Sequence, residues 1–298
     1  MSITLESIER INALKNGIEA VTGESYEDLT SGVQALKNGY GQSGFPYIDT
    51  SKMTSFAYFH SGGANAELIN KWDTSNAQNL SNMFTNCPLG DYVLDINTSK
   101  AENCASMCSG QYDHSNVRFK NKLDMSNCVN CNSMFYSRGM TDFPLENTGK
   151  VTTFFNAFYS GKFTEAELDL TSCTDIRSAF INCKNLKKLI LHNSQITSSY
   201  WENAVKGCTS LEDFYIDYFK VTGTSADFST CNSLSIESLI NLLEVLVDNT
   251  GVYDGKGNPY SIKLGSNNIT KLKNQGIEDH QDELYYISIA TNKNINLV

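Results

Sequence analysis

The chain has 298 residues, of which 40% are hydrophobic, enough for one large domain or two small ones with a sizeable core. Its 23 basic and 33 acidic residues give a formal net charge of -10, which opposes binding to nucleic acid and to bare anionic membranes. No apolar stretch is long enough to span a membrane, and Met1 to Glu9 lack the pattern of a signal peptide, so we expect neither membrane insertion nor signal-directed secretion.

Residues 1–44 are predicted to form two amphipathic helices. The first carries apolar residues at every third or fourth position, namely Leu5, Ile8, Ile11, Leu14, Ile18 and Val21. The second begins at Ser25, where Asp28 completes a capping-box signal, and ends at Asn38-Gly39. Because short helices are marginal in isolation, we expect this segment to pack on the next region or to attach the chain to sister copies as a homo-oligomer.

Residues 45–234 are organised by a repeat. The segment Leu123 to Cys128, followed by Ser133-Met134-Phe135, reappears as Leu168 to Cys173 followed by Ser178-Ala179-Phe180. The residues that close successive units are Phe59, Phe84, Cys108, Phe135, Phe158, Phe180, Val205 and Phe228. Their spacing of about 22 to 27 residues lies inside the roughly 20 to 29 typical of leucine-rich repeats, which predicts about eight units.

Each unit is expected to form one coil of a solenoid. It opens with a short apolar-alternating stretch, such as Lys188 to Leu191, which reads as a strand. A turn rich in Ser, Thr, Asn and Cys follows, and then a helical or looped segment with the closing residue. Because no unit can bury its apolar side alone, the units must stack. We therefore predict an α/β leucine-rich-repeat solenoid with parallel strands along one face.

Residues 235–298 are predicted to cap the open end of this solenoid. Ser235 to Val247 reads as a strongly apolar helix and Tyr260 to Leu264 as a strand. Glu278 to Ala290 reads as a second helix, and Asn294 to Val298 as a last strand. Two enlarged helix and strand units suit an element that shields the last repeat from water.

The nine cysteines admit more than one interpretation. Cys128 and Cys131 have a C-x-x-C spacing that is compatible with a zinc site, and disulfides are also possible. The alignment favours buried thiols, because every cysteine occupies a recurring slot of the repeat. Cys183, Cys208 and Cys231, for example, each lie three residues after a closing residue. We therefore expect no metal site and no cofactor.

A column of aspartates also recurs with the repeat. Its members are Asp49, Asp73, Asp95, Asp124, Asp169 and Asp217. Stacked coils would bring neighbouring carboxylates close enough to share a divalent cation. The interpretation that we favour is that each carboxylate accepts hydrogen bonds from backbone groups of its own turn, because the column is interrupted at Leu145 and Leu191.

Aromatic residues are the best candidates for a binding site. Tyr136 and Tyr159 each follow a closing Phe directly, and His60 holds the same position in the first unit. If the closing ring points inward, these three side chains point outward and form a row suited to stacking on sugars or protein. The sequence lacks H-E-x-x-H, G-x-S-x-G and P-loop motifs. We predict no catalytic residues and no enzyme.

The repeats resemble those of BspA-type leucine-rich-repeat surface proteins. The likeness is strongest at Trp72 to Cys87, "WDTSNAQNLSNMFTNC", which is close to the repeat abundant in mycoplasma lipoproteins. It weakens from Ser194 to Cys208, where Val205 replaces the closing aromatic residue. Because such repeats occur mostly in adhesins and binding proteins, the resemblance implies contact rather than catalysis.

The two ends resemble another group, the tail-associated proteins of Firmicutes phages and prophages. "YEDLTSGVQALKNGYG" at Tyr26 to Gly41 is similar to a segment near the start of such proteins, and "LSIESLINLLEVLVDNTG", "IKLGSNNITKL" and "IATNKNINLV" are similar to their ending. Asn294-Ile295 stands where that ending usually has glycine and tryptophan.

Together these resemblances imply a phage tail protein for host recognition. It would be assembled in the bacterial cytoplasm and reside in the virion tail, with a host cell-surface glycan or protein and other tail proteins as partners. Two alternatives stay open, a purely structural virion protein without a host ligand and a bacterial BspA-like surface adhesin.

Overall fold

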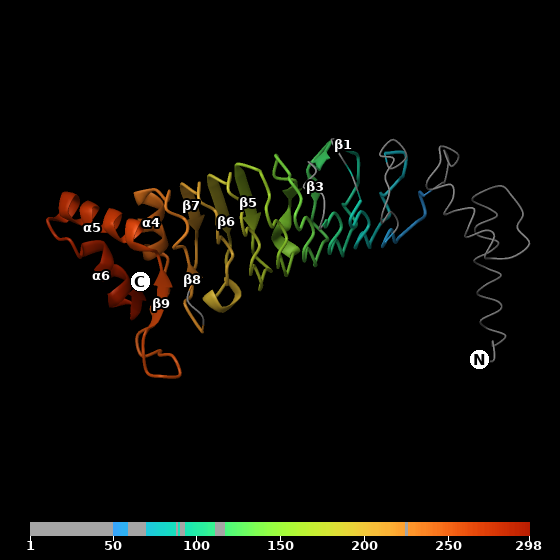
Figure 1. The fold of residues 1–298 in the computed structure, drawn as a ribbon. Coiled ribbons are helices and arrows are strands. Elements are labelled where there is room, and N and C mark those ends of the chain that lie inside the picture. Colours follow the sequence, from blue (N-terminus) through green and yellow to red (C-terminus); the bar gives the residue numbers. More distant parts are fainter. Residues whose placement is uncertain (1–49, 59–69, 88, 90–92, 111–116, 224–225) are drawn as a thin grey trace, which may run out of the picture.

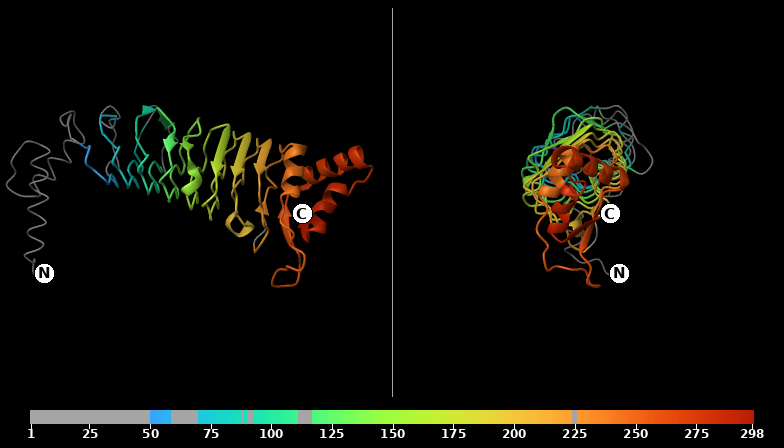
Figure 2. Two further views of the ribbon diagram at one scale, coloured as in Figure 1. Left: turned by 180° about the vertical axis from the view of Figure 1, so that it is seen from behind. Right: turned by 90° about the vertical axis from the view of Figure 1, so that its left-hand side faces the viewer.

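The fold is a repeat solenoid, as predicted (Figure 1). The computed structural model describes residues 50–58, 70–87, 89, 93–110, 117–223 and 226–298. Successive coils stack into an elongated body, and the view along its axis shows them lying over one another (Figure 2). The helices predicted in residues 1–44, together with Asp49, Phe59 and His60, lie outside the described residues. The count of eight units therefore stays a prediction.

Short parallel strands pair from one coil to the next. They are β1 (Val93–Leu94), β2 (Arg118–Phe119), β3 (Leu123–Asp124), β4 (Leu145–Glu146), β5 (Glu165–Asp169), β6 (Lys188–His192), β7 (Asp213–Ile216) and β8 (Ala226–Asp227). β1 pairs with β2, β3 with β4, and β5, β6 and β7 form one three-stranded sheet. In β5 the apolar residues Ala166 and Leu168 are buried while Glu165 and Glu167 are exposed, which is the alternation of a half-buried strand.

A second ladder of parallel contacts joins the coils at their turns. Single bridges link Ser55, Asn79, Asn103, Asn130, Thr153 and Asp175 in that order. In the first coils Asn79 and Asn103 accept, through Oδ1, the backbone N–H two residues ahead at 3.0 Å. A short polar side chain is required at this position because it replaces a backbone acceptor in the turn.

The Ser or Asn two residues before six of the closing residues has a structural reason. Asn82, Ser106, Ser133, Asn156, Ser178 and Asn203 all have left-handed backbones, with φ between 52° and 59°. Among residues with a side chain, Asn and Ser tolerate this conformation better than bulky or β-branched ones. The repeated "Ser-x-Phe" pattern is thus a turn signature.

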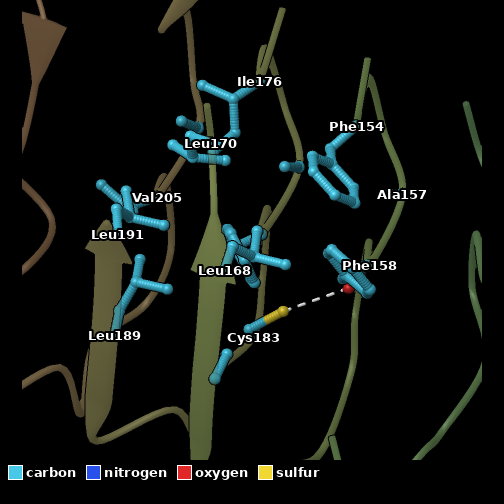
Figure 3. Close-up of a cluster of buried hydrophobic side chains, with 14 of the residues drawn as sticks. Phe154, Ala157, Phe158, Leu168, Leu170, Ile176, Cys183, Leu189, Leu191 and Val205 are labelled. Carbon is cyan, nitrogen blue, oxygen red and sulfur yellow. Dashed lines mark hydrogen bonds between the residues drawn. The ribbon is translucent and has the colours of Figure 1, made fainter. Parts of the chain in front are cut away.

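The closing residues form the centre of the core. Phe84, Cys108, Phe135, Phe158, Phe180, Val205 and Phe228 are all fully buried. The first five stay in register because each backbone N–H donates to the carbonyl of the residue before the next closing residue, as Phe135 does to Ala157 at 2.8 Å and Phe158 to Ala179 at 2.8 Å. Figure 3 shows Phe158 facing Leu168 of β5 in the interior. The predicted stack of aligned residues is confirmed for these coils.

Two 3-10 helices and three α-helices complete the described residues. The 3-10 helices, η1 (Thr148–Lys150) and η2 (Ser198–Tyr200), occupy turns of the solenoid. α4 (Ile236–Glu244), α5 (Ser266–His280) and α6 (Tyr285–Asn292) gather at the C-terminal end with β9 (Tyr260–Lys263) and β10 (Ile295–Leu297) (Figure 1). None of the helices in the described part of the chain is both long and apolar enough to cross a membrane.

The C-terminal region closes the solenoid in two ways. Ser238 of α4 accepts from the Phe214 N–H at 2.8 Å and donates to the Glu212 carbonyl at 3.0 Å, so this helix covers the free edge of β7. β8, β9 and β10 then continue the parallel pairing. The helix predicted from Ser235 and the two predicted strands are confirmed, with Ser235 as the N-cap of α4.

The helix predicted over Glu278 to Ala290 is wrong. The chain forms α5 up to His280, turns at Gln281, which has a φ of 54°, and begins α6 at Tyr285. Gly276 permits the turn, because a Cβ there would clash with the Asp282 carbonyl oxygen. The start of α5 gave little signal, since this helix is mostly polar and Leu272 is its one buried large apolar side chain.

Candidate functional site

The structure brings Tyr136 and Tyr159 together on neighbouring coils. Their ring centroids lie 4.7 Å apart with an interplanar angle of 29°, so the rings stack. Both side chains are half-buried, while Phe135 and Phe158 beside them are fully buried. Asn182 Nδ2 of the next coil donates to the Tyr159 hydroxyl at 3.3 Å. His60, the third residue of the predicted row, lies outside the described residues.

A second aromatic group, which we did not predict, lies on the turns of the following coils. The Arg177 guanidinium carbon is 5.4 Å from the Phe155 ring centroid and 5.5 Å from that of Tyr200. Two hydrogen bonds to Asp175, of 3.0 and 2.7 Å, fix the guanidinium and raise the pKa of Arg177. The group is a cation held between two rings. Phe155 and Arg177 each lie three residues before a closing residue, so an alignment of that position would have paired them.

The outward face of the β5–β6–β7 sheet is a third candidate. The strand register places Lys188 between Glu165 and Asp213, and Ile190 between Glu167 and Tyr215. Tyr215 is 42% exposed. His192 follows on β6, with its Nε2 3.0 Å from Glu167 Oε1 and its ring centroid 6.1 Å from that of Tyr215.

Two hollows flank β6 on this face. The first, of about 330 Å³, lies over β5 and is lined by residues that include Asp142, Phe143, Phe163, Glu165 and Glu167. The second, of about 350 Å³, is lined by β7 and the start of α4. Lys188 and Ile190 line both, so the two hollows adjoin on either side of β6, and together they are called the groove below.

Part of the aspartate column anchors the backbone of its own turn, as we favoured. Asp73, Asp124 and Asp169 each accept the N–H two residues ahead, at 2.8 to 3.0 Å. Asp95 instead pairs with Lys120, and Asp217 accepts the N–H groups of Asn193 and Ser194 from the preceding coil. Burial alone raises the pKa of Asp124, but hydrogen bonds from Asn147 and Ser126 leave it lowered overall. Among the described residues no three His, Cys, Asp or Glu side chains are arranged to hold a metal ion.

The cysteines are buried free thiols. In three successive coils the thiol donates to the carbonyl of the preceding coil's closing residue: Cys183 to Phe158 at 3.1 Å (Figure 3), Cys208 to Phe180 at 3.1 Å, and Cys231 to Val205 at 3.4 Å. This repeat position therefore suits a small side chain that is also a weak hydrogen-bond donor. Cys128 and Cys131 also contact each other, with their sulfur atoms 3.6 Å apart.

Ionisation of these thiols should destabilise the protein in alkali. Burial raises the pKa of Cys108 and of Cys173 from 9.0 to about 12. The unfolded chain therefore loses these protons first, and the free energy of unfolding is expected to fall as the pH rises from about 9 towards 12. Urea unfolding with a reductant at about pH 8 and about pH 10.5 measures the change. Cys108→Ala should show a shallower fall, and equal slopes for the two proteins would contradict this explanation.

Comparison with known proteins gives one family. The family model described as "Mycoplasma protein of unknown function, DUF285" matches residues 48–170, which is less than half of the chain. This segment runs from the first described coils to β5 and includes both Tyr136 and Tyr159. No curated protein and no solved structure matches the chain.

Proposed function

We propose that this chain is a tail-associated protein of a Firmicutes phage that recognises a host cell-surface glycan or protein through a non-catalytic repeat surface. The likeness of both ends to phage tail proteins supports the location. The likeness of the repeats to BspA-type adhesins, together with the family match over residues 48–170, supports a contact role. About eight leucine-rich repeats would form the surface, and the N-terminal helices would attach it to the tail or to sister copies.

The stacked Tyr136–Tyr159 pair carries this proposal. The closing rings beside it are fully buried, but these two phenols lie partly at the surface and are ordered by each other and by Asn182. A preordered aromatic platform loses little conformational entropy on binding. Its apolar faces suit the C–H faces of a sugar, and its hydroxyls can exchange hydrogen bonds with a glycan.

A double substitution tests the pair. Purified chain carrying Tyr136→Ala and Tyr159→Ala should bind intact cells of the phage's host at least about tenfold more weakly than the unmodified chain, as expected for a binding hot spot. Labelled protein and flow cytometry give the measurement. Tyr253→Ala is the control, since Tyr253 is 51% exposed and lies far along the chain in the C-terminal region.

The outcomes separate the proposal from its alternatives. Unmodified chain that does not bind host cells would remove host recognition and favour a purely structural role in the virion. If unmodified chain binds and the double variant binds equally well, the protein recognises the host by another surface and the tyrosine pair is not the site.

A further inference from the structure

We infer that the groove across β5, β6 and β7 binds a basic, extended segment of a partner protein. The site is separate from the tyrosine pair and does not depend on the proposed function. The three strands lie side by side in the C-terminal half of the solenoid, with α4 beside β7 (Figure 1). The groove thus has a regular floor and a closed end, formed by the edge of α4.

The charge of the groove selects a cationic partner. Its two hollows are lined by five carboxylates against two lysines, which leaves a formal net charge of -3; these residues are Asp142, Glu165, Glu167, Asp213 and Glu237, with Lys122 and Lys188. All seven side chains are exposed. Such complementarity raises the association rate and discriminates against acidic partners.

The first hollow fits a single long basic side chain. Phe143 supplies aromatic surface, and Asp142, Glu165 and Glu167 line the same hollow together with Lys122 and Lys188. An arginine or lysine would lay its methylene stem on the Phe143 ring and place its charged end among the three carboxylates. The volume of about 330 Å³ accommodates one such side chain.

The second hollow fits an apolar side chain with a nearby N–H donor. Ile190, Phe214 and Tyr215 line it with apolar surface. Asn241 also lines it, and the Oδ1 of this residue is buried without a hydrogen-bond partner. Rotation of that terminal amide would offer the acceptor to a ligand N–H, which would remove the cost of an unsatisfied polar atom.

The spacing of the two hollows determines the shape of the ligand. They lie on opposite sides of the Lys188 and Ile190 side chains of β6. Because neighbouring strands are about 4.8 Å apart, an extended peptide that crosses β6 presents side chains two residues apart to the two hollows. The expected motif is therefore a basic residue and an apolar residue with one residue between them.

A peptide of that pattern is the probe. Fluorescein-labelled Arg-Ser-Leu-Ser-Arg-Ser-Leu is titrated with the full chain by fluorescence anisotropy, with Glu-Ser-Leu-Ser-Glu-Ser-Leu as the reference peptide. We expect the basic peptide to bind at least about tenfold more tightly than the acidic one, and Glu165→Gln with Glu167→Gln to weaken that binding by at least about tenfold.

A matched variant distinguishes binding in the groove from nonspecific electrostatic attraction of the peptide to the acidic protein. Glu202→Gln with Glu278→Gln removes the same two charges from exposed positions outside the groove and should leave the affinity within about twofold. Tyr136→Ala with Tyr159→Ala should leave it unchanged. Equal losses in the groove and matched variants, or equal affinity for the two peptides, would overturn the inference and leave host recognition by the tyrosine pair unaffected.

Discussion

Phe158→Ala should lower the free energy of unfolding by about 3 to 5 kcal/mol, the cost of removing a large buried ring from a packed core. The side chain is fully buried. Its ring centroid lies 5.1 to 6.2 Å from those of five others: Phe135, Phe143, Phe154, Phe163 and Phe180. Phe135, Phe163 and Phe180 belong to neighbouring units, so the substitution removes contacts between units. Urea unfolding followed by circular dichroism measures the loss.

The neighbouring tyrosine provides the control for this prediction. Tyr159→Ala removes a half-buried ring at the next position and should cost about 1 kcal/mol or less. Phe158→Leu should fall between the two, because leucine refills part of the cavity. A Phe158→Ala variant as stable as Tyr159→Ala would mean that the closing residues do not hold the coils together.

Arg138→Met should cost about 2 to 4 kcal/mol, although methionine is the more apolar side chain. The guanidinium is fully buried and donates to backbone carbonyls of two other coils, with 2.6 Å from Nε to the Cys108 oxygen and 2.9 Å from an Nη atom to the Cys87 oxygen. Removing the donors leaves these carbonyls buried and unsatisfied. A loss of that size in urea unfolding identifies Arg138 as a link between coils.

Gly110 offers an independent check of the Arg138 prediction. A Cβ at Gly110 would lie 2.7 Å from the Arg138 guanidinium carbon, so Gly110→Ala should destabilise the protein by displacing that group. In the Arg138→Met background the same substitution should cost much less, because the shorter side chain lacks the clashing atoms. The double-mutant cycle should show coupling of about 1 kcal/mol or more. Strictly additive effects would contradict the contact, and Arg118→Met controls for loss of an exposed arginine.

Much of the fold was predictable because a repeat imposes the same physical demands at each position. The closing residues could be aligned by spacing alone, and the structure buries those of the described coils. The recurring cysteine slots were predictable for the same reason. The geometric cause of the Ser or Asn before the closing residue was not, because a left-handed backbone leaves no apolar period for pattern analysis to detect.

The error in the C-terminal region has a clear physical origin. α5 buries one large apolar side chain, Leu272, so its amphipathic signal was too weak to find. The stretch from Tyr285 to Ala290 is more apolar, and its pattern predicts a helix there. That predicted helix wrongly continues backwards across the turn at Gln281. Element type was right for part of this segment, and the helix boundaries were wrong.

The candidate sites differ in how far the sequence revealed them. Tyr136 and Tyr159 were found because they share one repeat slot. Arg177 and Tyr200 lie in different slots of their units, so their contact depends on the stagger between coils. The groove depends on which strands extend far enough to form a sheet, and on the loop at Asp142 and the edge of α4. Neither the Arg177–Tyr200 contact nor the groove has a local sequence signal.

Phage adsorption is the measurement that tests host recognition most directly. Host cells are incubated with increasing amounts of the purified chain before addition of a phage proposed to carry the protein in its tail, and free phage is counted over time. We expect the chain to occupy receptors and slow adsorption in proportion to its dose, and the Tyr136→Ala and Tyr159→Ala variant to slow it far less. Adsorption that stays unchanged at saturating chain would contradict the account.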